Sequence, residues 1–288
     1  MIEAPPATVV HHSSGFGEWQ SVRRAPDPRL RPYVTSYEGY VETRTTFTTR
    51  MEVPSTDAVM IINLGPAYRV GGPGNGHRDA EYGSFAAGMV DAHVLVEATG
   101  LAAGLQVNFT PIGAGLFFGL PMSELTNRTV SLHDIFGADA ARLEAQLDDT
   151  PDWDARFRIL DAFIARRLIA APPPPAAVAF AMDRLTRTGG RASIQSLAEA
   201  AGWSRKHLAS QFRQHIGLPP KTMARIIRFN RAQNLLREHT GARWTDLALQ
   251  CGYYDQAHFN RDFRDFTGGT PSEYLRRTIP GDGGISGD

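Results

Sequence analysis

The chain has 288 residues, of which 42% are hydrophobic and 21% are charged, and its 30 Lys and Arg residues balance its 30 Asp and Glu residues. This composition is typical of a globular protein and excludes a fibrous or disordered chain, and the length suffices for two ordinary domains. Cys251 is the single cysteine, which excludes an intramolecular disulfide, and no basic-then-apolar leader or apolar run of ~20 residues is present, so we expect a cytoplasmic protein without a membrane partner.

The first part of the chain has the pattern of a β-rich domain. Residues 1–15 contain Pro, Ser and Gly with weak hydrophobic patterning, so we expect a loosely ordered start. Short segments rich in β-branched and aromatic residues follow, separated by turn signals such as LGP and GGPGNG. The predicted strands are 33–37, 58–62, 93–97 and 105–109. We therefore expect a sheet or a barrel from about residue 16 to 110.

After Pro111 the apolar residues change to helical spacing. Helices are predicted around Phe117, from 132 to 147 and from 153 to 169, and Asp152 is suited to cap the last of them. The domain formed by residues 16–171 is therefore expected to be α+β, with a β-rich sheet or barrel followed by helices.

Four consecutive prolines at 172–175 form an extended, stiff spacer, and we place the domain boundary there. From 176 to 280 every strong periodicity is helical, so this domain is expected to be all-α. The last residues, 281–288, are expected to be a flexible tail. The helical domain contains a near-repeat with a period of about 50 residues; its paired positions include Leu197-Ala198 and Leu247-Ala248, Gly202-Trp203 and Gly252-Tyr253, and Phe212-Arg213 and Phe263-Arg264.

Each copy of the repeat has the pattern of two short helices joined by a tight turn. Gly202 and Gly252 stand where the turn needs a left-handed backbone, and Ser204 and Asp255 can cap the helix that follows. Apolar residues one turn apart, such as Leu208 and Phe212, hold this second helix against the core. The residues that remain outward are Arg205, Lys206, His207, Ser210 and Arg213 in the first copy, and Gln256, Ala257, His258, Asn260, Arg261 and Arg264 in the second.

These outward residue types suit the major groove of DNA, where Arg261 could bridge a guanine, Gln256 could pair with an adenine and Ala257 could contact a thymine methyl group. Arg213 and Arg264 lie later on their helices, so we expect them to contact phosphates. The alternative for each residue is a solvated helix face, and His258 could instead cap or pack locally.

The segment between the copies, residues 222–237, is amphipathic without interruption. About 16 residues at ~1.5 Å each give a rod of about 24 Å, which could hold two recognition helices near the ~34 Å spacing of successive major grooves. The charge distribution agrees with this interpretation. Residues 176–280 hold 16 Lys and Arg against 8 Asp and Glu, whereas residues 1–175 hold 14 against 20, and DNA binding needs such clustered basic charge.

The helical domain resembles the DNA-binding domain of the AraC/XylS family of transcription regulators. SIQSLAEAAGWSRKHLASQF matches the first unit, and GYYDQAHFNRDFRDF followed by GGTPSEYL in the second unit is hard to obtain by chance. The resemblance covers about 100 residues and implies two helix-turn-helix units joined by a long helix. It implies that the helical domain binds double-stranded promoter DNA, and that the N-terminal domain binds a small-molecule effector, a second copy of the chain, or both. If the protein is an activator, RNA polymerase is a further partner.

Two departures from the family pattern lie in this domain. Ala209 and Ser210 are small where family members carry longer contacting side chains, and Met223 replaces the usual Tyr. We therefore expect the second unit to carry more of the base discrimination, and the first unit to contribute mainly through Arg205 and Lys206.

The N-terminal half carries no recognisable catalytic motif, and no cofactor is predicted. Its histidines are scattered without metal-ligand spacing, so no metal site is predicted; they are His11, His12, His77, His93 and His133. Trp19, Tyr37, Tyr40 and Phe109 could line an effector pocket or pack in the core. The alternative to a regulator is an enzyme with an appended DNA-binding module, for example an alkylation-repair fusion. That methyl-transfer chemistry needs a thiolate outside the helix-turn-helix core, whereas the single cysteine, Cys251, falls in a core position of the second unit.

Overall fold

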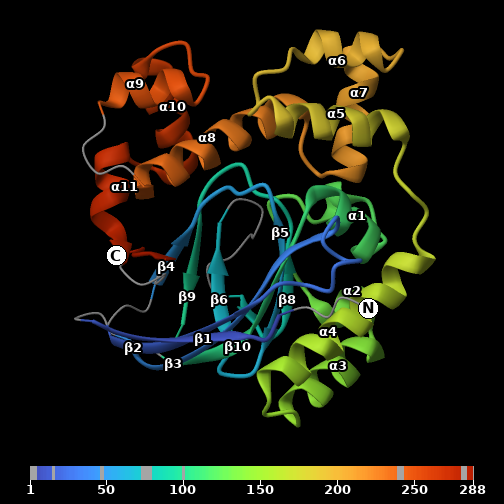
Figure 1. Ribbon diagram of the computed structural model, residues 1–288, viewed down its shortest axis with the longest axis vertical. Helices are drawn as coiled ribbons and strands as arrows, with labels where there is room; N and C mark the ends of the chain where they lie inside the picture. Colours follow the sequence, from blue (N-terminus) through green and yellow to red (C-terminus); the bar gives the residue numbers. More distant parts are fainter. Residues whose placement is uncertain are drawn as a thin grey trace.

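The computed structural model describes residues 5–14, 17–45, 49–72, 80–98, 101–238, 243–279 and 284–287. A β-rich N-terminal domain with flanking helices is followed by a helical C-terminal domain that rests on one end of the sheets (Figure 1). The predicted fold class, an α+β domain followed by an all-α domain, is confirmed. The two domains meet after the proline spacer, because the first helix of the C-terminal domain begins at Ala176.

Two antiparallel sheets form the N-terminal domain. The seven-stranded sheet has the order β1-β2-β3-β10-β5-β8-β11, and the four-stranded sheet has the order β4-β9-β6-β7. Residues from both sheets, such as Ile61, Tyr68 and Val94, share one small apolar cluster, so the sheets face each other. The bounds are β1 Thr8–Ser14, β2 Gly17–Arg24, β3 Val34–Thr45, β4 Thr49–Glu52, β5 Ala58–Asn63, β6 Tyr68–Gly71, β7 Glu81–Tyr82, β8 Phe85–Ala87, β9 Val94–Glu97, β10 Ala102–Phe109 and β11 Thr129–Ser131. The four predicted strands are confirmed as β3, β5, β9 and β10.

The expectation of a loosely ordered start is wrong for residues 8–14. Strand β1 pairs with β2 along its whole length, from Thr8 opposite Arg23 to Ser14 opposite Gly17. The His12 ring stacks on the Trp19 ring across this hairpin with 5.3 Å between centroids, and Trp19 is itself buried. The cross-strand pairing satisfies the backbone groups, which local hydrophobic patterning does not reveal. Residues 1–4, 15 and 16 lie outside the described residues.

The helices of this domain pack on the outer face of the larger sheet. They are α1 Pro111–Phe118, the short 3-10 helix η1 Met122–Glu124, α2 Leu132–Phe136, α3 Ala138–Asp148 and α4 Trp153–Ala170. Asp152 caps α4 as predicted, because its Oδ1 accepts the Ala155 N–H at 2.7 Å. Asp161 of α4 accepts hydrogen bonds from the Tyr37 hydroxyl at 2.9 Å and from Arg24 at 2.8 Å, which fastens this helix to the sheet. The predicted helix 132–147 is divided in two because the chain turns at Gly137.

The C-terminal domain consists of α5 Ala176–Arg187, α6 Ile194–Ala200, α7 Arg205–His215, α8 Pro220–Glu238, α9 Trp244–Gln250, α10 Gln256–Thr267 and α11 Pro271–Arg277. Helix α8 has 19 residues, so at ~1.5 Å per residue it is a rod of about 28 Å. It extends slightly beyond the predicted limits 222–237 and crosses the whole domain between the two helix-turn-helix units (Figure 1). Within the described residues no helix has the length and apolar character of a membrane span.

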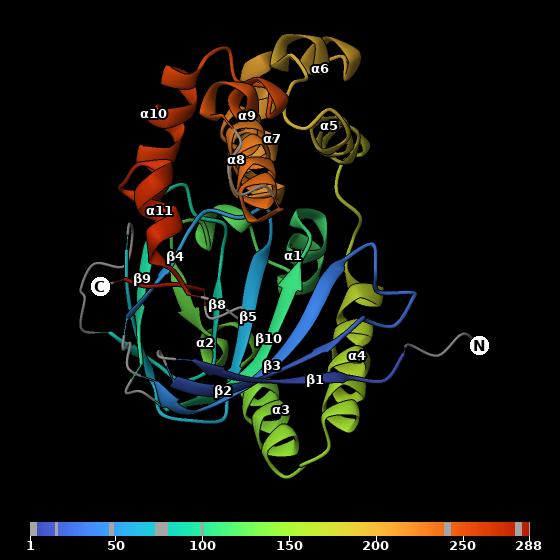
Figure 2. The same cartoon turned by 60° about the vertical axis from the view of Figure 1, so that its left-hand side comes forward.

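The helical domain is docked on the N-terminal domain rather than held only by the spacer (Figure 2). Met51 and Met89 of the N-terminal domain belong to the same apolar core as the helices of the C-terminal domain. The Asn230 side chain of α8 accepts the Thr56 N–H at 3.0 Å and donates to the Pro54 carbonyl at 2.8 Å. Helix α7 also contacts α1 and η1. The two domains are therefore joined by a shared apolar core, by hydrogen bonds to α8 and by contacts of α7.

The expected flexible tail, 281–288, is ordered where the structure describes it. Strand β12, Thr278–Ile279, pairs with β13, Gly284–Ile285, and β13 lies against β4. Ile285 is buried, and Arg277 donates from Nη2 to the Gly287 carbonyl at 2.7 Å. Strand β4 is at the edge of its sheet and offers free backbone groups, and the Gly287 N–H donates to the Thr49 carbonyl at 3.0 Å. Residues 281–283 and 288 lie outside the described residues.

Candidate DNA-binding interface

The first helix-turn-helix unit is formed by α6 and α7. Gly202 lies in the turn with φ +69°, a backbone conformation that costs glycine least. The Ser204 Oγ accepts the His207 N–H at 3.2 Å and caps α7. Leu208 and Phe212 are fully buried. The predicted turn, cap and anchors of this unit are confirmed.

The second unit, formed by α9 and α10, repeats this geometry. Gly252 occupies the turn with φ +86°, and Asp255 Oδ1 accepts the His258 N–H at 2.7 Å. Phe259 and Phe263 are fully buried and pack their rings together with 5.1 Å between centroids. Both copies of the sequence repeat therefore fold into a helix-turn-helix unit.

The GGTPSEYL motif has a structural role next to the second unit. Thr270 Oγ1 accepts the Glu273 N–H at 3.3 Å, and Glu273 Oε2 accepts the Thr270 N–H at 2.6 Å, so the two residues form a capping box that starts α11. The Thr270 N–H and the Thr270 hydroxyl both donate to the Glu273 carboxylate, and they are the main reason that the pKa of this carboxyl is lowered. The buried Tyr274 hydroxyl accepts a hydrogen bond from Gln233 Nε2 at 2.7 Å, which ties α11 to α8.

The predicted contact residues lie on the sides of α7 and α10 that face away from the core. Gln256, His258 and Asn260 are half-buried, and the other eight are exposed: Arg205, Lys206, His207, Ser210, Arg213, Ala257, Arg261 and Arg264. Two of the half-buried side chains have local partners. The His258 ring packs edge-on against Tyr253 with 5.2 Å between centroids, and Gln256 Oε1 accepts the Thr245 hydroxyl at 3.1 Å.

Helix α10 is fixed on α8 by an ion pair between a half-buried arginine and a buried aspartate. Arg225 of α8 donates from Nε to Asp262 Oδ1 at 2.9 Å, and it also contacts Asp265. Burial by itself would lower the pKa of the Arg225 guanidinium, but its hydrogen bonds and attraction to Asp262 and then Asp265 raise it. Its guanidinium also lies 4.8 Å from the centroid of the Phe266 ring. Since Asp262 is 2% exposed, this arrangement fixes the orientation of the second recognition helix.

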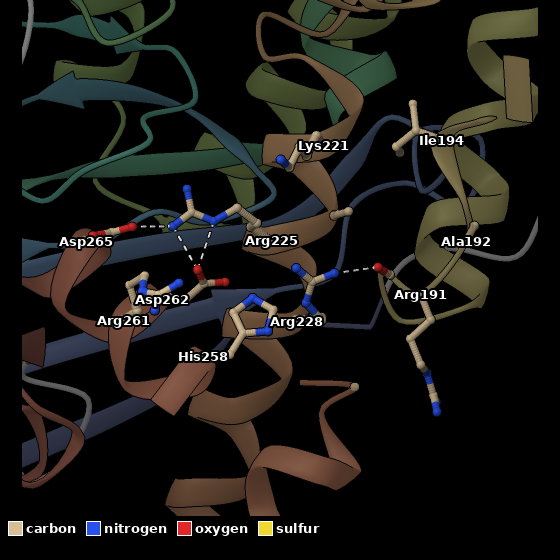
Figure 3. A pocket seen from close by; sticks show the side chains of 13 residues that line it. Arg191, Ala192, Ile194, Lys221, Arg225, Arg228, His258, Arg261, Asp262 and Asp265 are labelled. Carbon is tan, nitrogen blue, oxygen red and sulfur yellow. Dashed lines mark hydrogen bonds and ion pairs between the residues drawn. The ribbon is translucent and has the colours of Figure 1, made fainter. Parts of the chain in front are cut away.

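Sequence reasoning missed a group of basic residues between the two units. Lys221, Arg225 and Arg228 occupy one side of α8, and Arg191 precedes α6; all four line a groove of about 630 Å³ (Figure 3). Arg261, a predicted base contact, lines the same groove. Lys221, Arg225 and Arg228 are spaced by four and then three residues, which indicates one basic face of the helix. The apolar residues of the same segment indicate only its opposite, buried face.

The remaining candidate groups have structural surroundings. Burial raises the pKa of the Cys251 thiol to about 11, so the thiol stays protonated at neutral pH. Tyr37 and Phe109 do not share a pocket, because their rings stack in the core on Phe157 and Phe117, respectively. Tyr40 donates to or accepts from the Tyr68 hydroxyl at 2.9 Å.

The histidines of the N-terminal domain do not gather into a metal site where the structure describes them. Among the described residues no three His, Cys, Asp or Glu side chains are grouped closely enough to hold an ion. His133 pairs with Glu144 at 3.0 Å, His12 contacts the Ser21 hydroxyl at 2.9 Å, and His93 lies beside Gly268 of the helical domain. His77 lies outside the described residues.

Comparisons with known proteins agree with this geometry. A family model described as a helix-turn-helix domain matches residues 197–277, and one described as a domain of unknown function (DUF6597) matches residues 22–131. The HTH-type transcriptional activator RhaS of Enterobacter sp. (strain 638) is 36% identical over 81 residues, which are 28% of this chain and 29% of RhaS. An uncharacterized HTH-type transcriptional regulator of Staphylococcus aureus (strain MSSA476) is 35% identical over 82 residues, or 28% of this chain and 11% of that protein. The chain therefore spans well under half of the length of these relatives.

The fold extends to a solved structure of ToxT from Vibrio cholerae. Its TM-score is 0.51 at 13% identity, and the match covers 83% of this chain and 98% of that chain. The likeness shows that the order of a β-rich domain and a double helix-turn-helix domain is shared. Together with the duplicated geometry, the family-model match identifies residues 197–277 as a helix-turn-helix domain, as the resemblance to the AraC/XylS family implied.

Proposed function

We propose that the protein is a sequence-specific DNA-binding transcription regulator. The observation that carries this proposal is the pair of capped helix-turn-helix units on one rigid helix, α8, with exposed basic and small polar side chains on both recognition helices. An HTH recognition helix reads base edges in the major groove with residues near its N-terminus. The first turns of α7 and α10 carry such residues.

The two units have unequal roles in this proposal. On α10, Gln256, Ala257, Asn260 and Arg261 read base edges, because their amide, methyl and guanidinium groups match adenine, thymine and guanine. Arg264 and Arg213 contact phosphates and set the register. The first unit acts mainly through Arg205 and Lys206, with His207 and Ser210 beside them, and His258 supports the second unit from its contact with Tyr253.

The N-terminal domain modulates this activity by binding a small-molecule effector, by self-association, or by both. The shared apolar core and the Asn230 hydrogen bonds support this proposal, because a shift of β4 or of the loop that follows it would change the contacts that position α8. The partners of the regulator are promoter DNA in the cytoplasm, a second copy of the chain and, for activation, RNA polymerase. A thermal-shift screen of metabolites tests the effector, because a ligand of the folded state must raise the melting temperature.

The test of DNA reading is selection of binding sites from a library of randomised duplexes, followed by affinity measurements on the selected duplex and a scrambled one. We expect a defined motif and a preference of at least ~10³ over the scrambled duplex. Arg261→Ala should weaken binding to the selected duplex by about 1–3 kcal/mol and relax the choice of one base pair. The matched control is Arg166→Gln, which removes an exposed charge on α4 in the N-terminal domain. Selection without an enriched motif would refute the proposed function.

A further inference from the structure

A groove of about 630 Å³ separates the two helix-turn-helix units. Helix α8 forms its floor with Lys221, Arg225 and Arg228. Residues 190–192 and the first residue of α6, Ile194, form one wall, and α10 forms the other (Figure 3). The groove is thus built from three separate elements of the domain. None of its basic residues except Arg261 belongs to a recognition helix.

The lining of this groove has an excess of positive charge. Five of its residues carry a cationic side chain and two, Asp262 and Asp265, carry a carboxylate. Both carboxylates contact Arg225. The cationic groups of Arg191, Lys221, Arg228 and Arg261 make no ion pair with another described residue, which leaves a formal charge of +3 in the groove.

One basic side chain of the floor, Arg228, is held in place by its neighbours. Arg228 donates from Nη1 to the Gly190 carbonyl at 2.7 Å and lies 5.4 Å from the centroid of the Tyr253 ring, so its guanidinium is positioned without a carboxylate. Gly190 has φ +73°, and a Cβ there would lie 2.3 Å from the Ala224 carbonyl oxygen. The backbone at Gly190 therefore packs directly against α8. Arg228 therefore provides a fixed positive charge in the floor of the groove.

We propose that this groove binds backbone phosphates of the DNA strand that runs between the two major grooves occupied by α7 and α10. This inference rests on the proposed function. Arg261 faces outward on α10 and also lines the groove, so a duplex seated on α10 brings its backbone to the groove. Phosphodiester oxygens are the anions that such a duplex presents between successive major grooves.

Within this site the residues have different tasks. Lys221 and Arg191 are exposed and supply the direct contacts to phosphate oxygen. Arg228 is half-buried and provides the fixed charge behind them. The contacts carry no base information, so they should strengthen binding to every sequence equally.

The test uses the full chain, the selected duplex and the scrambled duplex, with affinities measured over a range of salt concentrations. The variants are Lys221→Gln and the double variant Lys221→Gln/Arg191→Gln. Glutamine keeps the aliphatic part of Arg191 that packs on Gly252. Each lost phosphate contact should make the negative slope of log K against log salt shallower by about 0.9, and weaken binding about eightfold at 0.1 M salt. Both duplexes should be affected by the same factor, and Arg166→Gln should leave affinity and slope unchanged.

The outcomes separate this inference from the proposed function. An unchanged affinity and salt slope in the double variant, with specific binding intact, would overturn the groove as a DNA contact and leave the regulator in place. Loss confined to the selected duplex would assign base reading to these residues and would also overturn it. Titration of inorganic phosphate without DNA is the third arm: a melting-temperature rise in the wild type that the double variant lacks, without any DNA effect, would assign the groove to a free anion instead.

Discussion

The interface between the two domains depends on one side chain of α8 whose removal has a calculable effect. Asn230 makes two hydrogen bonds to the loop that follows β4, one with the Thr56 N–H at 3.0 Å and one with the Pro54 carbonyl at 2.8 Å. Asn230→Ala deletes both. It also removes a contact with Gln233 Oε1 at 3.0 Å within α8.

The expected loss of stability follows from these contacts. A neutral hydrogen bond contributes about 1 kcal/mol net, and a buried polar group left without a partner costs about 1–3 kcal/mol. Pro54 is buried and Thr56 is half-buried, so water can replace the partner of Thr56 more easily than that of Pro54. We expect a decrease of about 2–3 kcal/mol in the free energy of unfolding.

Urea unfolding followed by circular dichroism measures this decrease, with the midpoint falling and the slope unchanged. Asn234→Ala is the matched control, because Asn234 lies one turn further along α8 and is exposed; its effect should be within ±0.5 kcal/mol. Equal urea midpoints for the two variants would refute the role of Asn230 in docking.

Three further predictions concern a glycine, the single cysteine and an exposed lysine of the helical domain. Gly190→Ala should destabilise the protein by more than Gly119→Ala. Both glycines have a left-handed backbone, which costs an alanine about 1–2 kcal/mol, but only at Gly190 would the new Cβ meet a carbonyl oxygen, that of Ala224 at 2.3 Å. Equal melting temperatures of the two variants would contradict this. Cys251, with its pKa raised to about 11 by burial, should resist iodoacetamide at pH 7.5 until the protein is unfolded, and rapid alkylation of the native protein would disprove its burial. Lys206→Ala should weaken binding to all duplexes alike, and the negative slope of log K against log salt should become shallower by about 0.9; a change in base preference would show instead that Lys206 reads sequence.

Local patterns in the sequence predicted much of the fold. The four prolines marked the start of the helical domain, and the repeat located both turns and both helix caps, because a cap at Ser204 or Asp255 depends only on residues three positions away. The β-branched runs likewise located strands such as β5 and β10. These features depend on near neighbours in the chain, so one sequence is enough to indicate them.

Features that depend on distant partners were missed. Strand β1 has no clear alternation, and its pairing is decided by β2. The last strand, β13, is stabilised by β4, more than 200 positions earlier in the chain, and nothing local to residues 281–288 indicates this. The basic groove is missed for the same reason, since its wall at Gly190 meets α8 only after folding. The candidate recognition residues are predicted from each helix alone, whereas their shared groove is a product of packing.

The pairing of β13 with β4 limits how the helical domain can move. The chain joins the two domains at the proline spacer, and the described tail fastens them again at the edge of the smaller sheet. This second attachment adds to the shared apolar core and the Asn230 hydrogen bonds, so the helical domain cannot swing freely about the spacer. A signal from the N-terminal domain that released β13 would leave the apolar core and the Asn230 hydrogen bonds as the remaining attachments, so the tail contributes part of the free energy needed to undock the helical domain.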